Sequence, residues 1–229
     1  MNPVALDGDA VRGLLRKVAA GLVQHREEIG GLDAKVGDGD LGITVELMAK
    51  ALFRFAESTE EADLGRLLAQ CGMAVNRANP STFATVMASG LLGGGRAVMG
   101  KTSAAIDDWV AIGEAAIEGI KNRGKASVGD KTLLDALVPA VTALKAERVK
   151  GSNERTAMWA AVQACEDGMK ATVGMVAKFG KARVFQERSM GVQDGGATAV
   201  YYMVQAAAEY IDSTSMSCEG ACTTRPLWW

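Results

Sequence analysis

The chain has 229 residues, of which 48% are hydrophobic and 23% are charged, with a formal net charge of −2. This length is enough to bury a full core in one domain, or in two small ones at most. No long basic run and no apolar run of membrane-spanning length occurs, which argues against nucleic-acid binding and against a membrane protein. The N-terminal residues lack the pattern of a signal peptide, so we expect a soluble, cytoplasmic protein.

Apolar residues recur at helical spacing along almost the whole chain. The stripes run over residues 11–22, 45–53, 64–75, 106–120, 133–144, 158–176 and 200–208, and a segment rich in Ala, Gly and Met covers 81–99. They predict eight amphipathic helices, and no segment alternates regularly enough to predict a strand. The short connections favour antiparallel neighbours, so the expected fold class is all-α.

Residues 95–102 match G-x-x-x-x-G-K-[ST], the pattern of a phosphate-binding loop. That loop needs a buried strand before its first glycine, and the apolar segment before Gly95 does not read as a strand. We interpret the match as accidental, and we expect a glycine-rich helix end with Gly100 as the cap and Lys101 close to the helix C-terminus.

Three aspartates, Asp33, Asp38 and Asp40, lie close together in the glycine-rich segment LDAKVGDGDLG. Such a loop can fold tightly enough to aim several carboxylates at one point, where divalent cations remove their repulsion. Hard oxygen ligands on a flexible loop suit Mg²⁺. An EF-hand is excluded because its last ligand position, counted from Asp38, is Ala49. The alternative is a solvated loop in which Asp40 caps the next helix.

Further polar and glycine-rich clusters fall at predicted helix junctions, over residues 123–132, 180–183 and 187–197. Each can be read as an ordinary surface loop, and 123–132 as a loop that ends in an Asp or Thr N-cap. If the helices alternate in direction, however, these loops share one end of the molecule with the aspartates. The loop after the third predicted helix belongs to the same end and leads towards residues 88–90. The clustering predicts a site at that rim.

Taken together, these motifs resemble the L subunit of dihydroxyacetone kinase, the nucleotide-binding half of that kinase family. The resemblance is carried by LDAKVGDGDLG (32–42), ASG (88–90), RGKASVGDKTLLDALVPA (123–140) and ERSMGVQDGGA (187–197). It implies a barrel of eight antiparallel helices with the nucleotide site at one rim. It also implies a domain over 1–211, and it leaves 212–229 as a C-terminal tail whose order stays open.

The resemblance implies a role for each matching residue. Asp33, Asp38 and Asp40 would hold two Mg²⁺ ions, which in turn bind the phosphates of ATP or ADP. The implied nucleotide-binding residues are Leu41, Gly42, Ile43 and Thr44, Ala88 and Ser89 in a second phosphate-binding turn, Gly124 and Leu133 at the base, Lys181 in place of an arginine, and Asp194, Gly195 and Gly196. No catalytic residue is expected beyond the metal site.

In the resembling family a separate K subunit holds the ketose covalently through a histidine, and His25 is the only histidine here. The implied function is the nucleotide-binding subunit of a kinase in glycerol metabolism, whose acceptor is dihydroxyacetone or a four-carbon ketose. The alternatives are a carrier with tightly bound ADP that a phosphotransferase protein recharges, and a non-catalytic regulatory protein. A homodimer is left open.

Overall fold

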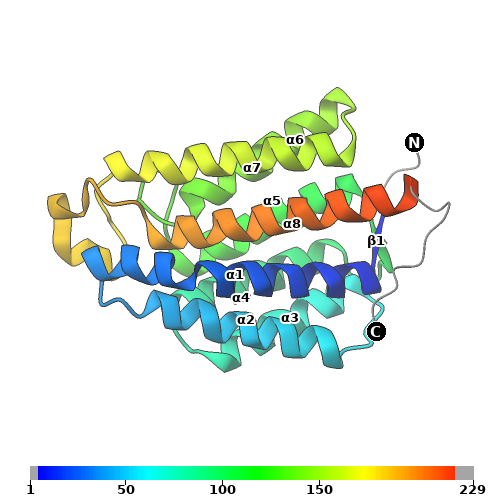
Figure 1. Ribbon diagram of the computed structural model, residues 1–229, viewed down its shortest axis with the longest axis horizontal. Coiled ribbons are helices and arrows are strands. Elements are labelled where there is room, and N and C mark those ends of the chain that lie inside the picture. The colour runs from blue at the N-terminus through cyan, green and yellow to red at the C-terminus, as the bar shows by residue number, and fades with distance from the viewer. Residues whose placement is uncertain (1–4, 220–229) are drawn as a thin grey trace, which may run out of the picture.

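The computed structural model describes residues 5–219 and is mostly helical (Figure 1). Its described part contains eight α-helices, as predicted: α1 (Gly8–Val36), α2 (Leu41–Ser58), α3 (Leu64–Ala78), α4 (Thr82–Ala97), α5 (Ile106–Gly124), α6 (Leu134–Lys150), α7 (Glu154–Ala171) and α8 (Gly195–Glu219). Two 3-10 helices, η1 (Thr172–Gly174) and η2 (Lys181–Ser189), lie between α7 and α8. Residues 220–229, most of the predicted tail, lie outside the described residues.

The expectation of no strand is wrong in one detail. Strands β1 (Leu6–Asp7) and β2 (Ser103–Ala104) pair antiparallel, with Leu6 opposite Ala104. Two-residue strands are too short to produce the alternating pattern by which a strand is recognised in a sequence. The pair joins the start of α1 to the connection between α4 and α5.

Short polar side chains begin most of the helices by accepting a hydrogen bond from a first-turn N–H. These caps are Asp7 on α1 (2.9 Å to Ala10 N), Asp63 on α3 (3.0 Å to Arg66 N), Ser81 on α4 (3.1 Å to Ala84 N), Asn153 on α7 (2.8 Å to Thr156 N) and Asp194 before α8 (2.7 Å to Ala197 N). The capping residues therefore fix where the loops end, including the loop that leads into α8.

Each helix contacts the next one in the chain, and α8 returns to contact α1. The described helices thus form a closed sequence of neighbours that alternate in direction (Figure 1). One apolar cluster is formed mainly by α5 to α8 and a second mainly by α1 to α3. Phe83, Met87 and Trp109 pack against both clusters and so join the two halves of the core. None of the helices among the described residues is long and apolar enough to cross a membrane.

Helix α4 lies almost in backbone contact with its neighbour α3. A Cβ atom added to Gly95 would come within 2.6 Å of Gly65 O, and one added to Gly65 would come within 2.6 Å of Gly95 O. Glycine is a poor helix former, but here only a residue without a side chain permits the approach. This packing explains why the small-residue segment over 81–99 is helical.

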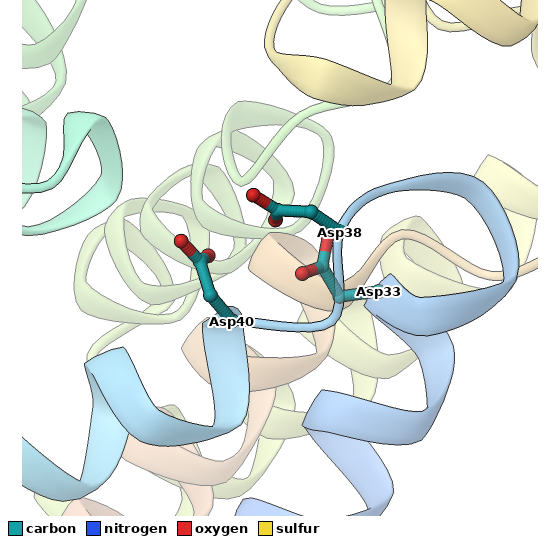
Figure 2. A group of neighbouring side chains, drawn as sticks. All are labelled: Asp33, Asp38 and Asp40. Carbon is teal, nitrogen blue, oxygen red and sulfur yellow. The ribbon is translucent and has the colours of Figure 1, made fainter.

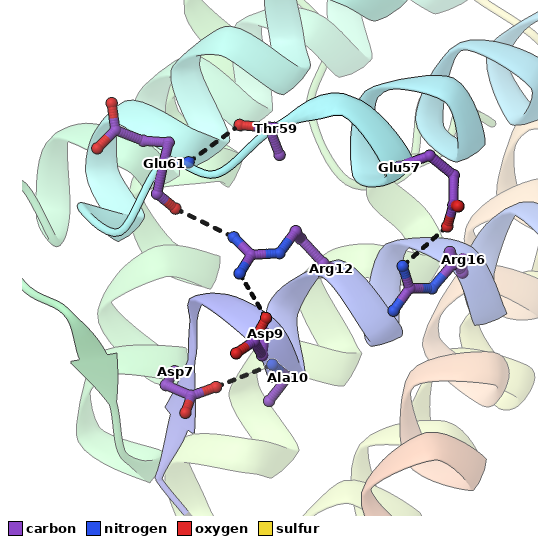
Figure 3. Close-up of polar contacts among 8 residues, drawn as sticks. All are labelled: Asp7, Asp9, Ala10, Arg12, Arg16, Glu57, Thr59 and Glu61. Carbon is purple, nitrogen blue, oxygen red and sulfur yellow. Dashed lines mark hydrogen bonds and ion pairs between the residues drawn. The ribbon is translucent and has the colours of Figure 1, made fainter.

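The two ends of the molecule differ in what they carry. Alternation places the loops after α1, α3, α5 and α7 at one end, on the left of Figure 1, as the sequence predicted. At the other end, Arg12 on α1 donates to Asp9 and to Glu61 O, and Arg16 donates to Glu57 (Figure 3). These contacts tie the start of α1 to the last turn of α2 and to the segment that follows it.

The phosphate-loop match lies at this second end, away from the aspartates. Gly95 is inside α4, so a helix stands where a phosphate-binding loop needs a buried strand. Gly100 has φ +82°, and its N–H donates to Asp63 at 2.9 Å. Lys101 pairs with Asp108. The match is therefore accidental, as predicted, although α4 ends at Ala97 and its C-cap is Val98 rather than Gly100.

Candidate functional site

The three aspartates of the first connection converge on one point. Asp33 lies in the last turn of α1, Asp38 in the loop, and Asp40 directly before α2 (Figure 2). One oxygen from each carboxylate lies within 4.8 Å of the other two. Asp33 is half-buried, whereas Asp38 and Asp40 are exposed. Three hard oxygen donors at this spacing, open to solvent on one side, fit divalent cations that also take ligands from another molecule.

Glycines make this convergence sterically feasible. Gly39 has φ +76°, a conformation that side chains other than glycine rarely adopt. A Cβ atom at Gly42 would lie 2.7 Å from Arg26 O and 3.1 Å from the Cα of Gly30. The first turn of α2 therefore crosses α1 at close range. The N–H of Leu41 donates to Asp33 at 3.2 Å, which links the two helices within the cluster.

Lys181, from η2, brings a positive charge to the cluster. Its Nζ donates to Asp40 at 2.7 Å and also to Asp38. These hydrogen bonds raise the pKa of Lys181, and the bond to Lys181 lowers the pKa of Asp38. Asp40 occupies the N-cap position of α2 but makes no side-chain capping bond, so the alternative in which it serves as a helix cap is wrong.

The other residues expected at the nucleotide lie in different settings. Thr44 is 2% exposed and accepts a hydrogen bond from Asn79 at 2.9 Å, whereas Ile43 in the same turn is 64% exposed. Ala88 and Ser89 lie inside α4, so the expectation of a turn there is wrong. The Ser89 hydroxyl donates to the carbonyl of Thr85, one turn earlier in the same helix, at 2.9 Å.

Gly124 and Leu133 lie on either side of the loop between α5 and α6. Gly124 is the last residue of α5, and Leu133, which is 7% exposed, comes directly before α6. A Cβ atom at Gly124 would lie 3.6 Å from Val86 of α4. The two residues thus belong to the rim. Among the described residues, no hydrogen bond links either of them to the aspartate cluster.

The start of α8 approaches the cluster closely. A Cβ atom at Gly195 would lie 2.8 Å from the side chain of Leu41 and 3.9 Å from the Cβ of Asp33, and one at Gly196 would lie 3.4 Å from Phe83. Asp194 caps this helix, and burial raises its pKa to about 6. The rim therefore brings the aspartates, the first turn of α2 and the 194–196 segment together.

Two residues at the rim, Lys131 and Asp135, were given no role by the sequence. Lys131 is 2% exposed and donates to four backbone carbonyls of the segment between α7 and α8. Asp135 is also 2% exposed and accepts from Gly129 N at 2.5 Å and Thr132 N at 2.7 Å. The expected Asp or Thr N-cap is wrong, because α6 has Leu133 at that position. In the sequence, Lys131 stands out only as a lysine between Asp130 and Thr132 within a glycine-containing loop, and this was the signal that could have drawn attention to it.

Comparison with known proteins places these observations in a family. The family model described as the DAK2 domain matches residues 35–209. The chain belongs to the DAK2 domain family. The matched part contains Asp38 and Asp40, and Asp33 lies just before it.

Two relatives are similar to this chain over most of their own length. The ADP-binding subunit DhaL of the PEP-dependent dihydroxyacetone kinase of Escherichia coli (strain K12) is 28% identical over 179 residues, which is 78% of this chain and 85% of the relative. The ADP-binding subunit DhaL of PEP-dependent dihydroxyacetone kinase 2 of Listeria innocua is 26% identical over 211 residues, which is 91% and 97% respectively.

Other matches are longer proteins. The D-erythrulose kinase of Mycolicibacterium smegmatis is 31% identical over 206 residues, which cover 89% of this chain but 35% of that kinase. The crystal structure of the dihydroxyacetone kinase from C. freundii in complex with AMP-PNP and Mg²⁺ matches with a TM-score of 0.71 at 25% identity. That match covers 91% of this chain and 35% of the kinase.

Proposed function

We propose that this chain is the ADP- or ATP-binding subunit of a dihydroxyacetone-kinase-like enzyme, and that its closed sequence of eight helices is the barrel of that family. The observation that carries the proposal is the convergence of Asp33, Asp38 and Asp40 at a rim that also holds Lys181 and the 194–196 segment. The relatives named as ADP-binding subunits and the matching kinase with AMP-PNP and Mg²⁺ support it.

In this proposal the three carboxylates hold two Mg²⁺ ions. When bound, Mg²⁺ neutralises the charge of the phosphates and of the group being transferred. The chain's own contribution is positioning: the crossing at Gly42 fixes Asp40 relative to Asp33, and the link from Leu41 N fixes Asp33 itself. Lys181, held beside the carboxylates, adds a positive charge that can also face the phosphates.

The remaining nucleotide contacts come from residues already at the rim. The proposed phosphate ligands are Leu41, Gly42, Ile43, Thr44, Ala88, Ser89 and Lys181, and the proposed base contacts are Gly124 and Leu133. Asp194, Gly195 and Gly196 are proposed to lie against the nucleotide. No side chain beyond the metal site is assigned to the chemical step. Phosphoryl transfer depends mainly on positioning and on charge neutralisation, so this residue set is sufficient for the nucleotide half of the reaction.

The ketose is proposed to arrive on a separate K subunit. This chain spans about a third of the longer kinases that it matches, so those proteins have ample sequence outside the DAK2 domain for an acceptor site. His25 does not offer the histidine that such a site needs, because its ring stacks on Tyr202 at 3.5 Å between centroids. The rim carries exposed apolar side chains suited to a protein partner, among them Ile43 (64% exposed) and Val184 (81% exposed).

Whether ATP or a phosphotransferase protein donates the phosphate is a second part of the proposal. The two relatives that match over most of their length are ADP-binding subunits of PEP-dependent kinases, which favours ADP as a resident group that is recharged in place. Dialysis of the purified protein distinguishes a resident ADP from an exchanging ATP donor. ADP that stays with the purified protein supports the resident group, and rapid exchange together with ATP turnover on addition of a K subunit supports an ATP-dependent kinase.

Calorimetric titration with ADP and ATP, with Mg²⁺ and then with EDTA, tests nucleotide binding. We expect Mg²⁺-dependent binding that Asp38→Asn and Asp40→Asn abolish together. Asp9→Asn is the matched control, because Asp9 is an exposed aspartate that pairs with Arg12 at the other end of α1. Absence of binding at millimolar nucleotide, or equal loss in the control, would contradict the proposal.

Localisation in the cytoplasm and the oligomeric state stay predictions.

A further inference from the structure

The segment between α7 and α8 leaves the bundle and returns with its two arms held together. Gly191 N donates to Val173 O at 2.8 Å, and Ala177 N donates to the hydroxyl of Ser189 at 2.9 Å. Asp194 N donates to the hydroxyl of Thr172 at 3.0 Å. These bonds form a neck, which we define as residues 172–177 on the outgoing arm and 189–194 on the returning arm.

The side chain of Lys131, from the neighbouring loop between α5 and α6, ends inside this neck. Its Nζ donates to Thr172 O at 2.8 Å and to Met175 O at 3.2 Å on the outgoing arm. It also donates to Ser189 O at 2.7 Å and to Val192 O at 2.6 Å on the returning arm. One ammonium group thus holds both arms.

Burial makes this an unusual place for a cation. Lys131 is 2% exposed, and among the side chains described, those of residues 5–214, no carboxylate lies within ion-pair distance of its Nζ. A buried ammonium is costly unless polar groups replace its hydration. The four carbonyls accept its hydrogen bonds here. Burial lowers the pKa of Lys131, and the negative charge of Asp194 opposes that shift. In return, four carbonyl oxygens that would otherwise repel one another can converge on one point.

The neck carries residues of the proposed nucleotide site on both sides. Lys181, which pairs with Asp38 and Asp40, lies within the loop that the neck closes. Asp194 ends the returning arm, and Gly195, directly after it, approaches Leu41. Any separation of the arms would therefore move Lys181 and the start of α8 relative to the aspartates.

We propose that Lys131 is a positioning residue of the nucleotide site, which acts by clamping the two arms of the neck. It does not itself touch the aspartate cluster. Its effect is to keep Lys181 against Asp38 and Asp40 and to keep the 194–196 segment beside α2. The link to nucleotide affinity rests on the proposed function, whereas the link to the placement of Lys181 does not.

The test compares Lys131→Met, which keeps the length of the side chain and removes its charge, with Lys131→Arg. Lys178→Met is the matched control, because Lys178 is an exposed lysine on the same segment that pairs with Asp130 at 2.8 Å. The first readout is hydrogen exchange at the neck amides of Ala177, Gly191 and Asp194. In Lys131→Met we expect these amides to exchange at least about ten-fold faster, with α3 amides unchanged.

The second readout is the rate at which the amine of Lys181 is acylated by a small active ester, followed by mass spectrometry. This rate reports the pairing of Lys181 with the aspartates and requires no nucleotide. The acylation rate should rise in Lys131→Met and stay at the wild-type level in Lys178→Met. In Lys131→Arg it should be intermediate between the wild-type rate and the rate in Lys131→Met. The third readout is the Kd of Mg·ADP, which should rise about ten-fold or more in Lys131→Met.

Each outcome has a distinct meaning. Unchanged acylation of Lys181 in Lys131→Met overturns the inference whether or not the neck loosens, because Lys131 then does not position Lys181. If wild-type protein binds no nucleotide, the proposed function fails while the first two readouts still decide the inference. If Lys131→Met does not fold, Ser189→Ala serves instead, since it removes the bond from Ala177 N across the same neck. Unchanged exchange and acylation in Ser189→Ala would then overturn the inference.

Discussion

The close crossing of α1 and α2 makes a sharp prediction for Gly42→Ala. The added Cβ would lie 2.7 Å from Arg26 O, about 0.7 Å inside an ordinary 3.4 Å contact, and the atom it meets is backbone. The two helices must therefore separate at the aspartate cluster. Overpacking of this kind costs about 1–3 kcal/mol. For a chain of this size that lowers the Tm by about 2–12 °C.

The same shift should weaken metal-dependent nucleotide binding. Metal ligands tolerate displacements of about 0.2 Å, so a separation several times larger should raise the Kd of Mg·ADP about ten-fold or more. Gly31→Ala is the matched control on α1, because a Cβ there meets nothing within 4 Å. It should raise stability by about 0.5–1 kcal/mol, the usual gain of alanine over glycine in a helix.

Thermal unfolding and calorimetry on the two variants decide the matter. The expected result is a lower Tm and weaker Mg·ADP binding for Gly42→Ala, and a slightly higher Tm with unchanged binding for Gly31→Ala. Equal stability and equal affinity in both variants would refute the reasoning, since the glycine crossing would then not be what positions Asp40 relative to Asp33.

Three further predictions concern charged side chains. Lys181→Met removes the ammonium that competes with cations at Asp38 and Asp40, so Mg²⁺ alone should bind up to about five-fold more tightly and Mg·ADP more weakly, as measured by calorimetry. Burial raises the pKa of Asp194 from 3.8 to about 6 in the folded protein. The folded state is therefore stabilised while Asp194 is protonated, and this contribution to the free energy of unfolding is lost as the pH rises through 6. Urea unfolding should show wild type losing up to about 3 kcal/mol more than Asp194→Asn between about pH 4 and pH 7. Lys101→Ala should leave nucleotide affinity unchanged, because the phosphate-loop match is accidental, and a large loss of affinity would contradict this.

Local patterns were sufficient to predict the helices and the rim. The apolar stripes give the number of helices, and their alternation brings the loop of Asp38 and Asp40 to the same end as Asp194. The convergence of the carboxylates was also predictable, because glycines lie on both sides of Asp38 and directly before Asp40. These features depend on residues close together in the sequence, where spacing and turn chemistry carry most of the information.

The parts that were missed depend on contacts between distant residues. Lys131 is clamped by carbonyls 41 to 61 residues away, and no local pattern reports which carbonyls a lysine will meet. Ser89 was expected in a turn, but α4 stays helical past it, and further along the helix Gly95 packs against α3. Tertiary packing there outweighs the poor helix propensity of glycine.

The most direct test of the central claim is a crystal grown with ADP and Mn²⁺ in place of Mg²⁺, with the anomalous signal of manganese used to locate the ions. We predict anomalous peaks bound by the carboxylates of Asp33, Asp38 and Asp40, with the diphosphate beside them. A nucleotide next to Lys101 and no manganese at the aspartates would contradict the account.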